Sequence, residues 1–361
     1  MNMRVLLATG SSGGHIFPAA ALMGRLNSSG ADVLMVLPKK ESGNKVLAGC
    51  EQAKYIHAAN LEFNLSSKNI KGAYLFFKGA WEGLRIIIQF KPDVVVGFGS
   101  LNTVALLFWA WLFRIKTVIH EQNVIPGRAN RLLAKFVDKV AVSFVQTNDY
   151  LSIPRERIIF TGNPIRDSLV KLDRKEALDF FNFKEGKFNI LITGGSQGSH
   201  KLNTVCCAAL SGCRQKNDLQ LVHISGVQDA EFLKQAYTQA GIAHKVFDFF
   251  TDMQYAYSLA DLVICRAGAT TIAELQRFGL PALLIPYPFA YAHQLNNAMV
   301  LKDSGAALIM RDEELCVEKL ADNIQGLLQE PEKLKAMRQS YTRSQATDAA
   351  GLLAHEVLNL N

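Results

Sequence analysis

Four glycine-rich turns are the segments of this 361-residue chain best suited to hold a charged ligand. Each turn follows a short apolar run and precedes a stretch with helical spacing. The turns are residues 10–14 (GSSGG), 97–100 (GFGS), 194–198 (GGSQG) and 266–269 (RAGA). Glycine lets the backbone turn tightly and approach a ligand closely, and the following helix offers free N–H groups and a positive dipole end. The pattern predicts phosphate-binding loops at the carboxyl ends of parallel strands.

The common nucleotide-binding motifs are absent from these turns. Residues 10–14 do not fit the dinucleotide pattern GxGxxG, and residues 194–201 do not fit the P-loop pattern GxxxxGK[ST]. No Asp-x-Asp pair occurs in the chain, which removes the usual carboxylate clamp for a metal–diphosphate complex. We therefore expect neither a metal nor a cofactor, so helix N-termini and side-chain donors must stabilise a phosphate leaving group.

Short apolar runs alternate with helix-like stretches and predict two parallel sheets. The runs are residues 4–9, 32–37, 93–97, 117–120, 140–142 and 158–160, then 189–193, 220–224, 245–247, 262–265, 282–285 and 306–309. Turn residues at 161–166 separate the two sets. The expected architecture is α/β, with two doubly wound Rossmann-like domains facing a cleft. The first covers residues 1–166 and the second 167–344, and a C-terminal helix at 345–361 packs back on the first.

Composition excludes several classes of protein. The chain is 49% apolar and 20% charged, which is ordinary for a globular protein, and its length suits two domains. No signal-peptide pattern is visible. The six cysteines are scattered without a CxxC pair, so we expect small buried thiols in a cytoplasmic protein rather than a zinc site or disulfide framework.

The net charge of +7 is unevenly distributed. Residues 1–166 contain 20 Lys and Arg against 10 Asp and Glu, whereas residues 167–361 contain 19 against 22. A basic N-terminal half indicates an anionic partner, such as nucleic acid, acidic lipid or a phosphorylated substrate, with a merely solvated basic surface as the alternative. No nucleic-acid recognition motif accompanies this charge, so nucleic acid is not an expected partner.

Ten consecutive apolar residues, 104–113, follow the second glycine turn and include Trp109 and Trp111. A membrane span needs about 20 apolar residues, so this run is too short to cross a bilayer. A buried or interfacial segment is expected instead. The two tryptophans lie about 200° apart around a helix of 3.6 residues per turn, so they cannot share one face.

Seven segments, in order along nearly the whole chain, resemble the MurG family of bacterial N-acetylglucosaminyltransferases. They are GSSGGHIFPA (10–19), HEQNVIPGRANR (120–131), TGNPIR (161–166), ITGGSQGSHKLN (192–203), ADLVICRAGATTIAEL (260–275), GLPALLIPYP (279–288) and HQLNNA (293–298). The combination of HEQN, GNP-x-R, GGSQG and CR-x-GA is far more specific than any single glycine turn.

The resemblance implies the GT-B fold and an inverting, metal-independent glycosyltransferase. The family moves GlcNAc from UDP-GlcNAc to the 4-hydroxyl of MurNAc in undecaprenyl-diphospho-MurNAc-pentapeptide, converting lipid I to lipid II in peptidoglycan synthesis. The implied partners are UDP-GlcNAc, undecaprenyl-linked lipid I, an anionic membrane surface and other cell-wall synthesis proteins. The implied location is peripheral, on the cytoplasmic face of the inner membrane. The alternative is another GT-B enzyme that uses a UDP-sugar, such as a diacylglycerol glycosyltransferase or a UDP-GlcNAc 2-epimerase.

Inverting transfer needs a base that accepts a proton from the attacking hydroxyl. His15 is the candidate general base, because an imidazole near a helix N-terminus is disfavoured in its charged form. A helix-capping role is the alternative for His15. Glu121 is a second candidate for proton transfer together with His120, although a role in orienting its loop is favoured for Glu121.

The resemblance also implies the residues that bind UDP-GlcNAc. They are Ser12, Gly13, Gly14, Asn123, Arg166, Ser196, Phe250, Ala269, Thr270, Thr271, Ile272, Ala273, Glu274 and Gln294. A carboxylate can accept two hydrogen bonds from a vicinal diol, so Glu274 suits the ribose hydroxyls. Ser196, with the amides that follow it, suits a diphosphate cradle.

Three positions depart from the pattern of the family. Phe250 replaces an aliphatic residue that contacts uracil mainly through its backbone, and His293 replaces a glutamine next to the retained Gln294. The second glycine loop reads GSLNT at residues 99–103, where the family has Gly-Gly-Tyr-x-Ser. The family's contacts to the acceptor therefore do not carry over to this loop.

The family docks on the membrane through an apolar patch with basic residues around it. The resemblance implies a patch that contains Phe77, Trp81, Trp109 and Trp111. Further apolar residues expected around it are Ile70, Tyr74, Phe76, Phe108 and Phe113, and the flanking basic residues are Lys68, Lys71, Lys78, Arg114 and Lys116. The alternative is that about half of these apolar side chains are ordinary core.

Overall fold

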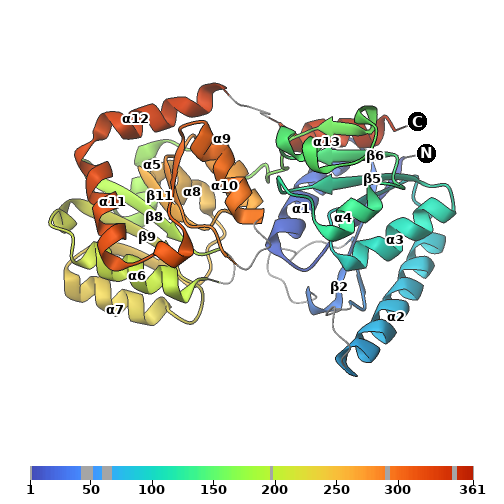
Figure 1. The fold of residues 1–361 in the computed structure, drawn as a ribbon, viewed down its shortest axis with the longest axis horizontal. Coiled ribbons are helices and arrows are strands. Elements are labelled where there is room, and N and C mark those ends of the chain that lie inside the picture. Colours follow the sequence, from blue (N-terminus) through green and yellow to red (C-terminus); the bar gives the residue numbers. More distant parts are fainter. Residues whose placement is uncertain are drawn as a thin grey trace. The chain divides into compact units, whose positions relative to one another are not determined.

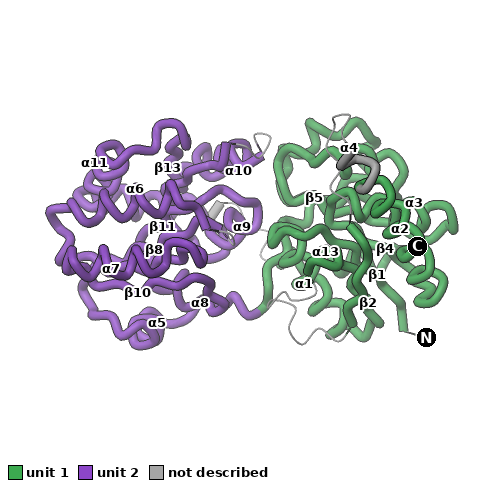
Figure 2. Tube along the Cα trace, turned by 90° about the horizontal axis from the view of Figure 1, so that it is seen from below, with its two compact units in different colours: residues 1–167, 346–361 green, residues 168–345 purple. Residues whose placement is uncertain are grey.

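The computed structural model describes residues 2–41, 52–58, 67–195, 198–288, 293–343 and 348–360. The chain forms two compact units (Figure 2). Unit 1 consists of Met1–Asp167 and Ala346–Asn361, and unit 2 consists of Ser168–Gln345.

Unit 1 is built on a seven-stranded parallel sheet with the order β3-β2-β1-β4-β5-β6-β7. The strands are β1 (Arg4–Ala8), β2 (Asp32–Pro38), β3 (Ala53–Ile56), β4 (Val94–Gly97), β5 (Lys116–Glu121), β6 (Lys139–Val142) and β7 (Ile158–Phe160). The central strands are buried almost throughout, as expected for a parallel sheet with helices on both faces.

Helices cover both faces of this sheet (Figure 1), and each face has its own apolar core. On one face lie α1 (Gly13–Ser28) and α13 (Ala349–Leu358), whose buried residues pack together although they come from opposite ends of the chain. On the other face lie α2 (Ser67–Phe90), α3 (Leu101–Leu112) and α4 (Arg128–Leu133). The C-terminal helix is thus part of unit 1.

Unit 2 contains a six-stranded parallel sheet with the order β10-β9-β8-β11-β12-β13. Its strands are β8 (Phe188–Thr193), β9 (Leu219–Ile224), β10 (Ala243–Phe247), β11 (Leu262–Cys265), β12 (Ala282–Leu284) and β13 (Ala307–Ile309). Its helices are α5 (Arg174–Phe181), α6 (His200–Ser211), α7 (Ala230–Ala240), α8 (Met253–Leu259), α9 (Ala269–Phe278), α10 (His293–Asp303), α11 (Val317–Gln329) and α12 (Pro331–Gln339).

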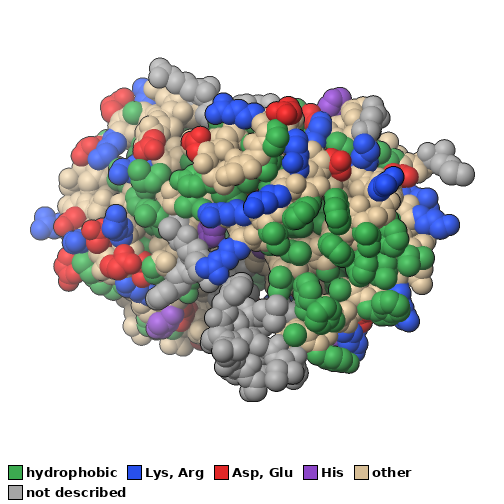
Figure 3. All heavy atoms as spheres, turned by 45° about the vertical axis from the view of Figure 1, so that its right-hand side comes forward, with side chains coloured by type: hydrophobic (Ala, Val, Ile, Leu, Met, Phe, Trp, Pro, Cys, Tyr) green, Lys and Arg blue, Asp and Glu red, His purple; other side chains and the backbone are tan. Residues whose placement is uncertain are grey.

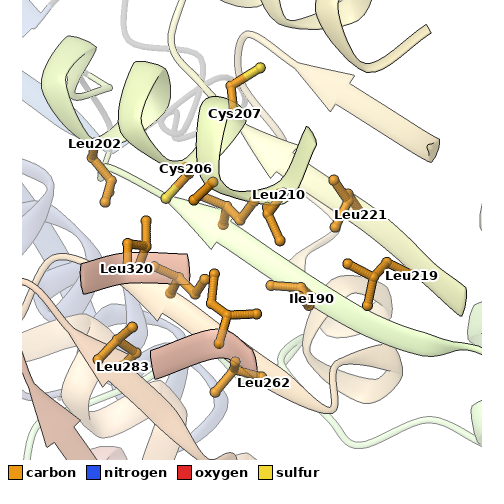
Figure 4. Close-up of a cluster of buried hydrophobic side chains, with 14 of the residues drawn as sticks. Ile190, Leu202, Cys206, Cys207, Leu210, Leu219, Leu221, Leu262, Leu283 and Leu320 are labelled. Carbon is orange, nitrogen blue, oxygen red and sulfur yellow. The ribbon is translucent and has the colours of Figure 1, made fainter. Parts of the chain in front are cut away.

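The cysteines of unit 2 belong to its packing. Cys206 and Cys207 lie on α6 above β8 and β9, among Ile190, Leu210 and Leu221 (Figure 4). Burial raises the pKa of the Cys206 thiol, so the thiol stays protonated and behaves as a small apolar side chain.

The predicted fold class is confirmed, because each apolar run coincides with a strand of one of two parallel, Rossmann-like sheets. The sequence did not reveal β3, which is an edge strand with a single buried residue and therefore lacks a buried apolar run. Within the described residues, no helix is both long and apolar enough to cross a bilayer.

Candidate active site

His15 lies in a narrow compartment between the loops that follow β1 and β4. A Cβ atom added to Gly10 would lie 2.5 Å from His15 Nδ1 and 2.8 Å from the Cβ of Ser100, so this position requires glycine. A Cβ on Gly99, whose φ is +89°, would lie 3.3 Å from His15 Nε2. The Oγ of Ser12 lies 3.0 Å from Nδ1. Burial lowers the pKa of His15 to about 4, so its imidazole is neutral at neutral pH.

Glu121 ends β5 and shapes the loop that follows it. Its Oε1 accepts hydrogen bonds from the backbone N–H and the side-chain amide of Asn123, at 2.9 and 3.2 Å. Its Oε2 accepts from the Gly127 N–H at 3.0 Å and from Asn130 Nδ2 at 2.8 Å. The buried carboxylate of Glu121 thus accepts hydrogen bonds from four donors. Such contacts are those of a residue that organises its loop.

His120 is completely buried in β5 and held in one tautomer. Its Nε2 lies 3.0 Å from the carbonyl oxygen of Gly162, and its Nδ1 lies 3.1 Å from Nε2 of Gln122. A carbonyl oxygen only accepts, so Nε2 carries the proton and Nδ1 accepts from the Gln122 amide. Burial lowers the pKa of His120 to about 4 and outweighs the Gly162 hydrogen bond, which raises it.

Arg166 lies beside the first glycine turn. Its guanidinium carbon is 4.9 Å from the centroid of the Phe17 ring on α1, within the range of a cation–π contact. The Phe17 ring also packs against Gly13, where an added Cβ would lie 2.9 Å from it. Nearby in sequence, Asn163 is buried, and neither polar atom of its amide has a hydrogen-bond partner among the described residues.

In unit 2, the loops after β8 and β11 are neighbours, because these two strands pair in the sheet. Gln294 of α10 fixes the second loop, since its Oε1 accepts from the backbone N–H groups of Ala267 at 3.1 Å and Tyr287 at 2.8 Å. Its amide oxygen is therefore engaged by the backbone. Any contact of Gln294 with a sugar hydroxyl must come from its Nε2.

The first turns of α9 contain six of the residues expected to bind the donor. The helix begins at Ala269 after Gly268, without a side-chain cap and without an acidic residue in its first turn. The Oγ1 of Thr270 is buried and has no hydrogen-bond partner in the described part of the chain. Glu274 is 9% exposed, and its Oε2 accepts a hydrogen bond of 2.7 Å from the Tyr257 hydroxyl. The helix start thus presents polar groups suited to an anion and a diol.

Arg266 is a residue of this region that the sequence analysis did not single out. Its guanidinium donates to Ser199 Oγ at 2.8 Å, to the Ile285 carbonyl at 3.1 Å and to Asp312 Oδ1 at 2.6 Å. One buried side chain thus connects the segments that follow β8, β11, β12 and β13. The available signal was an arginine placed directly after a buried strand and before a glycine.

The ring of Phe250 belongs to an aromatic cluster. Its centroid lies 4.5 Å from that of Phe247, 5.8 Å from Phe181 and 6.1 Å from Phe180, which stacks on Tyr255 at 4.0 Å. The side chain of residue 250 is therefore used for packing, which leaves backbone groups for any contact with a base.

Two expected sites fall wholly or partly outside what the structure describes. Ser196 lies outside the described residues, and so do the side chains of Lys68, Ile70 and Lys71. Across the described ranges, no three His, Cys, Asp or Glu side chains are grouped as metal ligands.

The expected apolar patch lies on α2 and α3, and Figure 3 shows hydrophobic side chains gathered on this face with basic side chains near them. Phe77 is 70% exposed, Trp81 56% and Trp111 48%. Trp109 differs, because it is only partly exposed, packs against the buried core and donates from its indole N–H to the Ala80 carbonyl at 3.0 Å. The two tryptophans thus divide between the surface and the packed interior.

Both units of the chain match domain models of one glycosyltransferase family. Residues 5–142 match the N-terminal domain model of glycosyltransferase family 28, and residues 189–353 match its C-terminal domain model. The crystal structure of Acinetobacter baumannii MurG is similar over 99% of both chains, with a TM-score of 0.77 and 27% identity. A UDP-GlcNAc 2-epimerase from Neisseria meningitidis has a TM-score of 0.71 at 16% identity, which indicates the fold alone.

Two full-length relatives identify the family. The proteins of Halothermothrix orenii and Listeria monocytogenes are 36% and 34% identical, covering 94% and 99% of this chain and of their own lengths. Both are named UDP-N-acetylglucosamine–N-acetylmuramyl-(pentapeptide) pyrophosphoryl-undecaprenol N-acetylglucosamine transferase. The chain is a two-domain family 28 glycosyltransferase. It belongs to this family of N-acetylglucosamine transferases, so the predicted family is confirmed.

The neutral state of His120 predicts a loss of stability in acid. The unfolded chain binds a proton at this residue below its ordinary pKa of about 6.5, whereas the folded chain does so only near 4. The free energy of unfolding should therefore fall between pH 6.5 and 4, by about 2 kcal/mol at pH 5 from this residue alone. His120→Gln should remove this part of the pH dependence.

The measurement is urea unfolding at pH 7 and pH 5, followed by tryptophan fluorescence. All three tryptophans lie in unit 1, so the signal reports on the unit that contains His120. His355→Gln, at an exposed histidine of α13, is the matched control and should keep the pH dependence of the parent. Equal acid losses in His120→Gln and the parent would show that burial does not hold His120 neutral.

Proposed function

We infer that this chain transfers GlcNAc from UDP-GlcNAc to the MurNAc 4-hydroxyl of lipid I, forming lipid II in peptidoglycan synthesis. The observation that carries this inference is identity of 34–38% over nearly the full length to relatives named for this activity. The epimerases share the fold at only 13–16% identity, which does not favour the alternative.

Unit 2 is the proposed donor site. The uncapped start of α9, with Thr270 in its first turn, suits the diphosphate, and Glu274 suits the ribose diol. The Tyr257 hydroxyl on Oε2 supports this role, because it fixes the orientation of the carboxylate before the donor arrives. Phe250 contributes its backbone to the base, and Gln294 its Nε2 to the sugar. On the family resemblance, Ser12, Gly13, Gly14, Asn123 and Arg166 are also proposed to contact the donor.

His15 is the proposed general base. When Nδ1 donates its proton to Ser12 Oγ, Nε2 is the nitrogen that accepts the proton of the 4-hydroxyl. The hydroxyl oxygen then bonds to C1 of GlcNAc as the bond from C1 to the UDP oxygen breaks. An imidazole with a pKa of about 4 is a weak base, and the negative charge of a bound diphosphate would raise that pKa toward the working pH. Glu121 is proposed to act on the loop rather than on the proton, because its two oxygens are engaged by four donors.

The direct test is incubation of the purified chain with radiolabelled UDP-GlcNAc and a short-chain lipid I analogue, with and without excess EDTA. The expected product is the disaccharide lipid, formed at the same rate in both conditions, because helix starts and side chains stabilise the UDP leaving group. Epimerised UDP-sugar without lipid product would support the alternative. Activity lost in EDTA and restored by magnesium would contradict the metal-independent mechanism.

Steady-state kinetics should separate the proposed roles of His15 and Glu274. His15→Ala should lower kcat by about 10²–10⁴-fold with the KM for UDP-GlcNAc nearly unchanged, as for loss of a general base. Glu274→Ala should raise the KM for UDP-GlcNAc by roughly 10–100-fold, since two charge-assisted hydrogen bonds are lost. A raised KM at full kcat in His15→Ala would make His15 a binding residue, and unchanged kinetics in Glu274→Ala would remove Glu274 from the ribose contact.

We also propose that the chain binds peripherally to the cytoplasmic face of the inner membrane through the exposed part of α2 and α3. Phe77, Trp81 and Trp111 would enter the headgroup region, and exposed Lys78 and Arg114 would face anionic lipids. Each such cation adds about 1 kcal/mol near an anionic surface. Lipid I is membrane-embedded, so this surface would bring the enzyme to its acceptor.

Vesicle co-sedimentation with phosphatidylglycerol, combined with thermal melting, tests this surface. Phe77→Ser and Trp111→Ser should lose vesicle binding at unchanged melting temperature, because they remove exposed apolar groups. Trp109→Ser should lower the melting temperature, because it removes a packed ring and its hydrogen bond to Ala80. Vesicle binding equal to the parent in both surface variants would mean that another surface reaches the lipid.

A further inference from the structure

A group of charged side chains closes the carboxyl ends of four strands in unit 2, beside the proposed donor site. Arg266 lies in its centre and is 7% exposed. Its guanidinium reaches Ser199 and Asp312, and its Cζ lies 5.5 Å from the centroid of the Tyr287 ring. The turn that carries Arg266 leads directly into α9.

Asp312 supplies the negative charge of this group. Its Oδ1 accepts from Arg266 at 2.6 Å, and its Oδ2 lies 3.1 Å from Nζ of Lys201, which also donates to the Asp312 backbone carbonyl. Burial alone would raise the pKa of the Asp312 carboxyl, but hydrogen bonds and charges from Arg266 and Lys201 outweigh burial and lower that pKa. The carboxylate therefore stays ionised between two cations.

The contact of Arg266 with Ser199 reaches the glycine loop after β8. A Cβ added to Gly194 would lie 2.6 Å from the Ser199 backbone nitrogen, so the first and last residues of the loop are in direct contact. Gly198, at φ +75°, would place a Cβ 2.2 Å from the Ser225 carbonyl oxygen. Ser199 thus packs against Gly194, and its neighbour Gly198 packs against Ser225, so Ser199 cannot move without disturbing these contacts.

Removing the Asp312 charge would leave a buried guanidinium without its counter-ion. A buried charge that loses its partner is strongly disfavoured, so Arg266 would turn toward solvent or toward any other anion within reach. The other anion expected here is the donor diphosphate. Arg266 would then leave Ser199 and contact the ligand in a geometry that the native loop does not provide.

We propose that Asp312 is a positioning residue for the sugar-nucleotide diphosphate, acting through Arg266 on Ser199, the residue that precedes α6. This inference rests on the proposed donor site in unit 2. Asp312 itself touches neither substrate. It holds Arg266 on Ser199, so that the starts of α6 and α9 meet the diphosphate in a fixed arrangement.

Kinetics of Asp312→Asn test the proposal. Displacement of a binding group by about 1 Å can cost roughly 10²-fold in rate, so kcat/KM for UDP-GlcNAc should fall by about 10–100-fold while the KM for the lipid acceptor stays within about twofold. Lys201→Met keeps the pair of Arg266 with Asp312 and should have a smaller effect. Asp218→Asn breaks an ion pair with Lys187 at an exposed site of the same unit and should behave like the parent.

A double-mutant cycle distinguishes positioning from simple loss of stability. If Asp312 acts through Arg266, Asp312→Asn should change kcat/KM less than twofold in an Arg266→Gln background. Calorimetric titration with UDP, well below each melting temperature, gives a second readout that does not need turnover. A single variant with a lower melting temperature but parental kinetics and UDP affinity would overturn the proposal.

Two further outcomes remain informative. If Asp312→Asn does not fold, Asp312→Glu replaces it, because this variant keeps the charge and moves it by one methylene. A reduced kcat/KM of Asp312→Glu at near-parental melting temperature supports the proposal, and parental kinetics contradict it. If the parent chain binds UDP and Asp312→Asn weakens that binding, but no lipid product forms, the proposed acceptor is wrong and the role of Asp312 stands. A parent that binds no UDP contradicts both.

Discussion

Burial of the central strands on both faces is the constraint on which the rest of this structure depends. Backbone groups inside each parallel sheet satisfy one another, and helices cover the faces, so the side chains of these strands are mostly apolar. The carboxyl ends of the strands are different, because loops leave the sheet and helices begin at that edge. His15, Glu121 and Arg266 all lie within a few residues of a strand's carboxyl end.

A polar group at this edge is still largely buried, and it is stable only when it is paired or neutral. Three solutions occur in this chain. Glu121 stays charged and gathers four donors, His120 stays neutral with one ring proton directed at a carbonyl, and Arg266 stays charged against Asp312. Each solution also fixes a loop, so groups that stabilise the edge are the same groups that shape it for a ligand.

This dual role explains what could be read from the sequence. Central parallel strands are runs of apolar residues, so the pattern of apolar residues along the sequence predicted their positions. The half-exposed edge strand β3 has no such run and was not predicted. Glycine turns marked the loops, and the resemblance to a family marked the expected ligand residues. The partners of Arg266 lie 19, 46 and 67 residues away in sequence, and the compartment of His15 is closed by Gly99 and Ser100 from another loop. Such contacts arise only from strand order, and spacing along the chain does not reveal them.

For the apolar run on α3, too, the sequence alone does not reveal which side chains are buried. Leu106, Leu107 and Ala110 are buried in the core that covers the sheet, and Trp109 packs beside them with its N–H on α2. A helix that contacts a sheet on one side and a second helix on another still has a third side. On α3 that side carries Phe108 and Trp111, each about half exposed and in contact with one another. Because the run is apolar all around, hydropathy cannot distinguish the buried side from the exposed one, and only the packing partners of the helix decide which rings reach the surface.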